Sequence, residues 1–332
     1  MSDALRLPDR LRFAQLPTPI EKLDRLSRHL GGPEIYVKRD DQTGLATGGN
    51  KARKLEFLLA DALGQQCDHV VTLGGAQSNH VRQTAAAAAR LGLGCSLVLR
   101  GEAPSHRLGN LLLDDLLGAQ IRFSGRRTVD EVAPEVMAEL KRSGARPYLI
   151  PLGGSNGRGA LGYVVALLEA LDQLATYKLE IDAMMFASSS AGTQAGLVLG
   201  AAIRHYPGRL LGISIDSTDV ELTARVIEFG FEAARLSGVE VAASDLRVEV
   251  NDDYLGGGYA IDGELERDAI RTVARTEGLL LDPVYTGRAM GGLIDLIHRR
   301  EFTSGQNILF WHTGGTAALS AFAERLTKDN EQ

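Results

Sequence analysis

The lysine at position 51 follows a glycine-rich turn and stands at the start of a predicted helix, where an amine can react with a bound ligand. The residues before it read Thr-Gly-Gly-Asn, and the two glycines allow a sharp backbone path. Apolar residues then recur at spacings of three and four, which predicts a helix over 50–63 with one apolar face (Leu55, Leu58, Leu59, Ala62 and Leu63). Taken alone, Lys51, Arg53 and Lys54 are more typical of a solvated basic face, because runs of charge usually contact water.

Three further segments, 74–79, 153–159 and 188–196, place small residues and hydroxyls between a strand and a helix. The unpaired backbone amides at a helix amino terminus, together with the helix dipole, favour an anion there. The segment 188–196 is the best candidate for a phosphate, because it offers consecutive serines, a glycine for close approach and a threonine. It lacks the Gly-Lys-Ser/Thr ending of a nucleotide P-loop, and an ordinary strand-to-helix turn remains an alternative for each segment.

A phosphate site together with such a lysine suggests an aldehyde cofactor that is held by its phosphate and by an imine to the lysine. Pyridoxal phosphate carries both groups, and a protein that binds it supplies mainly orientation and electrostatics. The residues leave a second interpretation open, in which the chain is a sugar-phosphate-binding α/β protein and Lys51 is a surface lysine.

Strands alternate with helices along the chain, and this pattern predicts an α/β protein with parallel sheets covered by helices on both faces. The predicted strands are 35–38, 69–73, 95–100, 120–123, 146–151, 183–187, 210–215 and 307–311. The predicted helices are 21–30, 50–63, 81–90, 107–117, 129–143, 160–175, one that follows the 188–196 segment, 219–236, 263–277 and a last one from 315.

Composition limits the class of protein. The chain has 332 residues, 44% of them hydrophobic and 23% charged, which is typical of a globular α/β protein. Its net charge of −6 disfavours a surface for nucleic acid or anionic membranes. Two cysteines, Cys67 and Cys95, do not support a disulfide framework or a metal site. We expect a cytoplasmic protein, because no signal peptide or membrane-spanning run is evident.

Five motifs give the sequence a specific resemblance. Thr-Gly-Gly-Asn-Lys, Gly-Gly-Ala-Gln-Ser-Asn-His, Ser-Ala-Gly-Thr-Gln-Ala-Gly, Asp-Pro-Val-Tyr-Thr-Gly and His-Thr-Gly-Gly occur in this order, at 47–51, 74–80, 190–196, 282–287 and 312–315. Over about residues 15–325 the chain resembles the D-cysteine desulfhydrase and 1-aminocyclopropane-1-carboxylate (ACC) deaminase family, which belongs to the tryptophan-synthase-β-like pyridoxal phosphate enzymes.

The resemblance implies two lobes, each with a mostly parallel sheet flanked by helices, and a site in the cleft between them. Residues 1–50 plus 162–332 would form the large cofactor-binding domain, and 51–161 the small one. It also implies a homodimer that acts on a small amino acid.

The family's cofactor is pyridoxal 5'-phosphate, and the resemblance assigns it to matching positions. Lys51 would form the covalent link and move a proton, and Asn79 would donate a hydrogen bond to the phenolic oxygen of the ring. Ser190, Ala191, Gly192 and Thr193 would hold the phosphate, and Asn50, Thr286 and Thr313 would complete the cofactor site.

The implied catalytic residues are Lys51, Ser78, Tyr259 and Tyr285, and the implied substrate-binding residues are Ser78, Asn79, His80, Ser155, Tyr259 and Tyr285. Some of these positions have structural alternatives. Tyr259 follows three glycines and could be a surface aromatic of a turn, and His80 could be a satisfied histidine at a helix start. Arg158, in the second glycine-rich segment, could face an anionic substrate, but exposure to solvent is the more common outcome.

Thr286 bears on the choice of substrate. In the deaminases an acidic residue follows the equivalent of Tyr285 and pairs with the pyridine nitrogen of the cofactor, whereas Thr286 has a neutral hydroxyl. A weaker electron sink suits loss of a good leaving group from the β-carbon better than the opening of a cyclopropane ring. We therefore expect α,β-elimination, most of all from D-cysteine, with L-cysteate second and ACC third. A protein that binds the cofactor without turnover is the alternative from another class.

Overall fold

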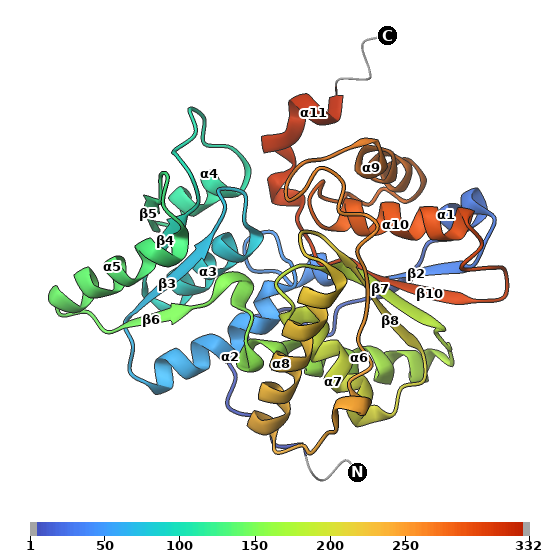
Figure 1. Ribbon diagram of the computed structural model, residues 1–332, viewed down its shortest axis with the longest axis horizontal. Helices are drawn as coiled ribbons and strands as arrows, with labels where there is room; N and C mark the ends of the chain where they lie inside the picture. Colours follow the sequence, from blue (N-terminus) through green and yellow to red (C-terminus); the bar gives the residue numbers. More distant parts are fainter. Residues whose placement is uncertain (1–4, 328–332) are drawn as a thin grey trace.

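The computed structural model describes residues 5–327 and has two lobes, each built on its own sheet (Figure 1). The small sheet is parallel throughout, with the strand order β5-β4-β3-β6 (Gln120–Phe123, Gly94–Leu99, His69–Gly74 and Pro147–Ile150). The large sheet has the order β1-β2-β10-β7-β8-β9 (Ile20–Lys22, Glu34–Lys38, Asn307–Trp311, Ala183–Ser188, Arg209–Ser214 and Glu249–Asn251). Its only antiparallel pair among the described strands is β1 with β2. The α/β class with two mostly parallel sheets is confirmed.

Helices cover both faces of the large sheet because successive strand residues point to opposite faces. On β10, Leu309 and Trp311 belong to one core cluster, and Ile308 and Phe310 belong to the other. The first cluster is shared with α6, α7 and α8 (Gly157–Tyr177, Gly192–Arg204 and Asp219–Ser237), drawn below the sheet in Figure 1. The second is shared with α1, α9 and α10 (Asp24–Leu30, Glu264–Glu277 and Thr286–His298), drawn above it.

The small sheet is covered in the same way. Val71, Leu73 and Val98 pack against α5 (Val129–Arg142), while Val70, Leu97 and Leu99 share a core with α2 (Lys51–Gly64) and α3 (Asn79–Leu91). The remaining helix of this lobe is α4 (Gly109–Leu116), and the described chain ends in a 3₁₀ segment and α11 (Thr316–Phe322 and Ala323–Thr327). No helix in residues 5–327 is long and apolar enough to cross a membrane.

Every predicted strand and helix has a counterpart in the structure, but two strands and one α-helix of the described chain were missed: β1, β9 and α10. The glycines of α10 are typical of a helix break, yet they serve close packing. A Cβ on Gly287 would lie 2.6 Å from the Asp282 carbonyl oxygen, and one on Gly291 would lie 2.6 Å from the side chain of Leu265 on α9. The two short strands, of three residues each, carry too few residues to show a periodic pattern.

The helix that carries Lys51 is enclosed, and the expectation of a solvated basic face is wrong. All residues from Ala52 to Leu59 are buried, including Arg53 and Lys54, whereas Leu63, which we placed on the apolar face, is partly exposed. Helix α2 packs on α6 of the large lobe and on α3 of the small lobe. Helix α2 thus contributes to the cores of both lobes. The domain boundaries at 50/51 and 161/162 stay a prediction.

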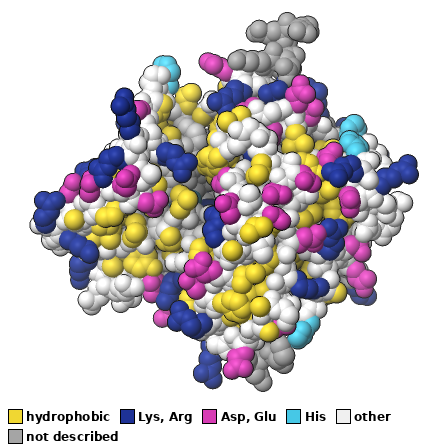
Figure 2. All heavy atoms as spheres, in the orientation of Figure 1, with side chains coloured by type: hydrophobic (Ala, Val, Ile, Leu, Met, Phe, Trp, Pro, Cys, Tyr) yellow, Lys and Arg dark blue, Asp and Glu magenta, His cyan; other side chains and the backbone are white. Residues whose placement is uncertain are grey.

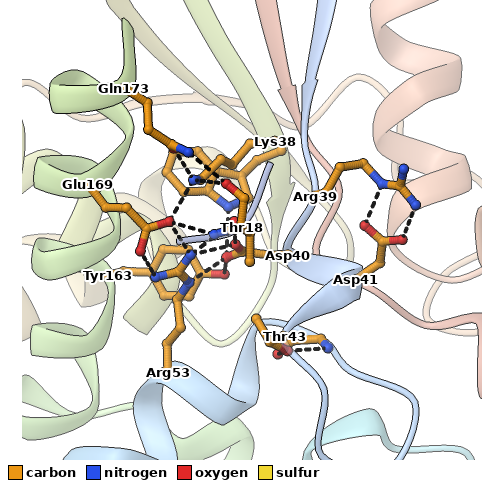
Figure 3. Close-up of polar contacts among 12 residues, drawn as sticks. Thr18, Lys38, Arg39, Asp40, Asp41, Thr43, Arg53, Tyr163, Glu169 and Gln173 are labelled. Carbon is orange, nitrogen blue, oxygen red and sulfur yellow. Dashed lines mark hydrogen bonds and ion pairs between the residues drawn. The ribbon is translucent and has the colours of Figure 1, made fainter. Parts of the chain in front are cut away.

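A buried polar cluster fixes α2 to the large lobe (Figure 3). Arg53 donates two hydrogen bonds to Asp40, at 2.8 and 2.9 Å, and two to Glu169 on α6, both at 2.9 Å. Asp40 also accepts from Tyr163 at 2.5 Å and from the Trp311 indole at 2.9 Å. Although burial alone raises it, the pKa of Asp40 is held below its usual value by the charge of Arg53. Arg53 lies two residues beyond Lys51 along α2, so its contacts in this cluster fix the start of that helix.

Candidate active site

A cavity of about 710 Å³ lies at the carboxyl ends of the parallel strands, between the two lobes. On the face drawn in Figure 2 the surface is hollowed between the lobes. Residues within two positions after the ends of β3, β4, β7, β8 and β10 line the cavity, which is where open α/β sheets place their ligands. Most of the predicted site residues meet here: Asn50, Lys51, Ser78, Asn79, His80, Ser190, Ala191, Thr193, Tyr259, Tyr285 and Thr313. Gly192, Ser155, Thr286 and Arg158 are not among the lining residues.

Lys51 is the first residue of α2 and remains partly exposed to the cavity. Its Nζ donates to the Asn50 side-chain oxygen at 3.1 Å. Burial lowers the pKa of Lys51 to about 8, and the charge of Asp282 opposes this shift. The neutral fraction of this amine near neutral pH is therefore much larger than that of an ordinary lysine, and the neutral form is the nucleophile that attacks an aldehyde.

An unusual backbone path leads into Lys51. Residues 44–49 all have positive φ, including the non-glycine residues Leu45, Ala46 and Thr47. A Cβ on Gly48 would lie 1.9 Å from the carbonyl oxygen of Asp41, so only glycine fits at that point. The buried guanidinium of Arg82 on α3 holds this path, because it donates to the Ala46 and Gly48 carbonyl oxygens at 2.8 and 3.0 Å and to the Thr47 hydroxyl.

The serine-rich segment forms the wall at the amino terminus of α7. Ala191 has a φ of 66°, and the helix begins at the next residue. Ser188 Oγ is buried and has no hydrogen-bond partner within the described part of the chain. The Thr193 hydroxyl accepts from the Asn50 side chain at 3.1 Å, which ties this wall to the turn before Lys51. The arrangement leaves amides and hydroxyls available for an anion.

Ser155, predicted to bind substrate, lies behind the serine-rich wall. Its Oγ lies 2.8 Å from Ser190 Oγ and accepts from the buried Lys54 amine at 3.0 Å. A Cβ on Gly192 would lie 2.7 Å from the same oxygen, so Gly192 permits this close contact. Ser155 therefore supports Ser190 from outside the cavity.

The second wall is the segment that enters α3. Ser78 is the N-cap of the helix, and its hydroxyl oxygen accepts from the Val81 amide at 3.3 Å. The side-chain oxygen of Asn79 accepts from the Asn110 amide nitrogen at 2.9 Å, so the amide nitrogen of Asn79 is the group left to donate. Asn110 is itself buried at the start of α4.

The side chain of His80 is an unsuitable carboxylate ligand. Thr72 donates its hydroxyl proton to the Ile150 carbonyl oxygen, so its oxygen accepts from His80 Nε2 at 2.8 Å. Burial lowers the pKa of His80 well below its usual value, and the neutral ring then has Nδ1 as an acceptor without a partner. An acceptor repels a carboxylate, so a role of His80 in substrate binding would fall to its backbone amide.

Tyr259 and Tyr285 meet at the far side of the cavity, with 2.7 Å between their hydroxyl oxygens. Tyr259 is partly exposed and lines the cavity, rather than lying on an outer turn. Burial raises the pKa of both phenols, so both are neutral at physiological pH. When one hydroxyl donates to the other, the accepting hydroxyl can direct its own proton into the cavity, and the donating one can direct a lone pair there.

Asp282 and Thr286 lie beneath the tyrosines at the start of α10. The Asp282 carboxylate is fully buried and accepts from the backbone amides of Val284, Tyr285 and Thr286 at 2.8 to 3.0 Å. It also accepts from the Thr286 hydroxyl. The Thr286 side chain is enclosed outside the cavity. A role of Thr286 toward the cofactor ring stays a prediction.

Arg158, which the sequence left as a possible substrate contact, and His312 of the His-Thr-Gly-Gly motif both lie outside the cavity lining. Arg158 forms an ion pair with Asp61 at 3.1 Å, away from the cavity. His312 is buried at the end of β10, where its ring bonds to the Leu280 carbonyl oxygen and to the Gly314 amide.

Four residues with structural roles at the site were not found from the sequence: Lys54, Arg82, Asn110 and Asp282. Asp282 is the first residue of the Asp-Pro-Val-Tyr-Thr-Gly motif, and this motif is the sequence signal that could have identified it. Arg82 and Asn110 carry no such signal, because their partners are distant in sequence and become neighbours only in the fold.

The cavity fits pyridoxal phosphate. It combines a lysine amine of lowered pKa, a buried serine hydroxyl without a partner and the amino terminus of α7. These groups match an aldehyde and a phosphate on one small molecule. Asn79, from the small lobe, lines the same cavity.

Comparisons with known proteins agree. Residues 11–314 match the family described as pyridoxal-phosphate dependent enzyme. A D-cysteine desulfhydrase of Klebsiella pneumoniae (strain 342) is 44% identical over 332 residues, which cover 98% of this chain and 99% of that protein. A solved structure of an ACC deaminase homologue has a TM-score of 0.88 and 41% identity and covers 96% of both chains.

Threonine deaminase isoform 2 of Solanum lycopersicum, in its processed form, shares the fold alone, with a TM-score of 0.65, 18% identity and coverage of 95% of this chain and 83% of that one. The predicted family and its fold are confirmed. Since the match spans both lobes and the cavity between them, the chain belongs to the pyridoxal-phosphate-dependent enzymes.

Proposed function

We propose that the chain is a carbon–sulfur lyase that removes the β-substituent of a small amino acid. D-cysteine is the preferred substrate, and pyruvate, hydrogen sulfide and ammonia are the products. The observation that carries the proposal is one cavity in which Lys51, the amino terminus of α3 and the Tyr259–Tyr285 pair face each other. The name of the 44% identical relative supports the choice of D-cysteine.

When bound, pyridoxal phosphate supplies an electron sink that weakens the bonds at the α-carbon of the substrate. The amides of Ala191 and Thr193 and the Ser190 hydroxyl hold its phosphate, and Asn79 donates to its ring oxygen. The amino terminus of α3 binds the substrate carboxylate through its backbone amides and the Ser78 hydroxyl. According to the enantiomer bound, the α-proton is taken by Lys51 Nζ in its neutral form, or by Tyr285 Oη or Ser78 Oγ, each of which must pass its own proton to a neighbouring acceptor as it takes the α-proton.

Lys51 is suited to proton transfer because its pKa of about 8 lies near the working pH. Tyr285 is held in place by the 2.7 Å contact with Tyr259, and its backbone amide donates to Asp282. Thr313 and Asn50 complete the cavity wall next to the lysine. The two lobes enclose the reacting atoms and so limit the access of water.

L-cysteate is the second candidate substrate, because two arginines, Arg100 and Arg225, line the cavity and could receive a sulfonate. Ring opening of ACC is the third, on account of the 41% identical ACC deaminase homologue. The ratio of ACC turnover to D-cysteine turnover by the wild-type protein tests this ranking, and it should lie well below one.

A substrate panel tests the proposal directly. Pyruvate, sulfide and sulfite are measured with D-cysteine, L-cysteine, L-cysteate, D-serine, β-chloro-D-alanine and ACC. Sulfide and pyruvate in equal amounts from D-cysteine are expected. A chromophore near 410–430 nm, an approximate range, without pyruvate from any amino acid would favour a non-catalytic cofactor-binding protein. We further propose a cytoplasmic homodimer, for which sedimentation analysis of the holoenzyme gives the oligomeric state.

A further inference from the structure

Three amide side chains, those of Gln77, Asn79 and Asn110, form a chain of hydrogen bonds beside the cavity. Gln77 and Asn79 line the cavity where the chain enters α3, whereas Asn110 is fully buried on α4 and is not among the lining residues. The side-chain nitrogen of Asn110 donates to the Gln77 carbonyl oxygen at 2.8 Å and to the Asn79 side-chain oxygen at 2.9 Å. An amide nitrogen has two protons, so these two bonds use both of them.

Backbone groups fix the orientation of all three amides. A backbone carbonyl can only accept, so the Gln77 carbonyl requires the nitrogen of Asn110 and not its oxygen. That nitrogen in turn requires the oxygen of Asn79. The Gln77 side chain is fixed in the same way, because it donates to the Leu108 carbonyl oxygen and accepts from the Asn110 backbone amide, both at 2.9 Å. The nitrogen of Asn79 is therefore the end that remains for an acceptor in the cavity.

The start of α4 is shaped for these contacts. Gly109 has a φ of 59°, and a Cβ there would lie 2.4 Å from the Gln77 side-chain oxygen and 3.1 Å from the Ala317 carbonyl oxygen. Glycine thus permits the close approach of Gln77. The side-chain oxygen of Asn110 is buried and has no hydrogen-bond partner within residues 5–327. A buried acceptor without a partner lowers stability, which is expected where a side chain is kept for its function.

We infer that Asn110 is a positioning residue that keeps the nitrogen of Asn79, rather than its oxygen, directed at the cofactor ring. The inference rests on the proposed function for the contact between Asn79 and the phenolic oxygen of the ring. A donor favours the ionised form of that oxygen, whereas the oxygen of Asn79 would repel it. Asn110 does not line the cavity, so it acts through Asn79.

Equilibrium binding of pyridoxal phosphate to the cofactor-free protein tests the inference without substrate. Asn110→Asp places an oxygen where the nitrogen now lies, so the nitrogen of Asn79 should turn toward it and the oxygen of Asn79 toward the ring. The dissociation constant of the cofactor should rise by about 10- to 100-fold, the effect of one hydrogen bond to a charged group. Part of the absorption of the bound cofactor should move to shorter wavelength, because the ring oxygen is then less ionised.

Asn110→Ala is a second variant that introduces no buried charge. It removes both bonds and lets Asn79 adopt either orientation, so a smaller rise of about 3- to 10-fold is expected. Asn307→Asp is the matched control for Asn110→Asp. The nitrogen of Asn307 also donates to a backbone carbonyl, that of Glu180 at 2.9 Å, but Asn307 lies outside the cavity. This control should bind the cofactor as the wild type does.

A double-mutant cycle separates positioning from a general loss of structure. In Asn79→Ala no amide remains to be turned, so the further change Asn110→Asp should alter the dissociation constant less than about twofold. Equal effects of Asn110→Asp in both backgrounds, an unchanged absorption spectrum in folded Asn110→Asp, or wild-type cofactor binding by Asn79→Ala would overturn the inference. Because no substrate enters these measurements, absence of pyruvate from every amino acid, with the coupling intact, would count against the proposed function only.

Discussion

Thr286 donates its hydroxyl proton to the Asp282 carboxylate across 2.7 Å and accepts from the Asp282 backbone amide at 2.8 Å. Both residues are fully buried, and this reciprocal pair closes the start of α10. The backbone amide of Tyr285 donates to the same carboxylate, at 2.9 Å. The position of a proposed catalytic tyrosine thus depends on a contact that lies outside the cavity.

Thr286→Val should lower the free energy of unfolding, because it leaves a buried acceptor and a buried amide without their partner. A loss of about 1–3 kcal/mol is expected. Urea unfolding measures it, with Thr286→Ser as the control that keeps the hydroxyl. A valine variant as stable as the wild type would show that the pair contributes nothing.

The rate at which pyridoxal phosphate attaches to the cofactor-free protein should rise as the pH passes through about 8, where Lys51 loses its proton. Burial favours the neutral amine, and the charge of Asp282 favours the protonated one. Asp282→Asn should therefore move the midpoint to lower pH. Stopped-flow absorbance follows the reaction, and a midpoint near 10.5, the ordinary value for lysine, would contradict the burial of this amine.

The same shift has a consequence for stability. The pKa of Lys51 is lower in the folded than in the unfolded chain, so protonation of Lys51 opposes folding. This cost is present in full below about pH 8 and disappears as the pH rises toward 10.5. In Lys51→Met the free energy of unfolding should lose this component of its pH dependence.

Arg82→Met should weaken cofactor binding through the turn before Lys51. The variant leaves the Ala46 and Gly48 carbonyl oxygens without their donor, at about 1–3 kcal/mol each, and the left-handed residues Leu45 to Thr47 each carry a further cost of about 1–2 kcal/mol. The turn should then relax away from its observed path. Reconstitution of cofactor-free protein gives the affinity.

Arg90→Met, at an exposed position on the same helix, is the control and should bind the cofactor as the wild type does. If both variants bound it equally well, the turn would keep its path without Arg82.

Arg53→Met should destabilise the fold by about 3–5 kcal/mol, because it leaves the carboxylates of Asp40 and Glu169 buried without their main cation. Arg122→Gln breaks an exposed ion pair with Glu139 and should shift the urea midpoint little. Similar midpoints for the two variants would mean that Lys38 alone balances the buried carboxylates.

The sequence was sufficient for most of the strands and helices and for many of the residues that face the cavity. Hydrophobic period and glycine turns located most strands and helices, and short motifs placed Lys51, Asn79 and Ser190 together. The burial of Arg53 and Lys54 could not be predicted, because Glu169 on α6, which accepts from Arg53, and the Gly153 carbonyl oxygen, which accepts from Lys54, lie 116 and 99 residues away in the sequence. Helix α10 was missed because the glycines that its close packing requires are typical of a helix break.

The central claim is that the amine of Lys51 binds the cofactor covalently. Borohydride reduction of the holoenzyme, followed by peptide mass spectrometry, identifies the lysine that carries the pyridoxyl group, and Lys54, one turn further along α2, is the built-in competitor. The account predicts the group on Lys51 and none in Lys51→Ala, which should also lose the chromophore. A pyridoxyl group on Lys54, or on no lysine of the cavity, would contradict it.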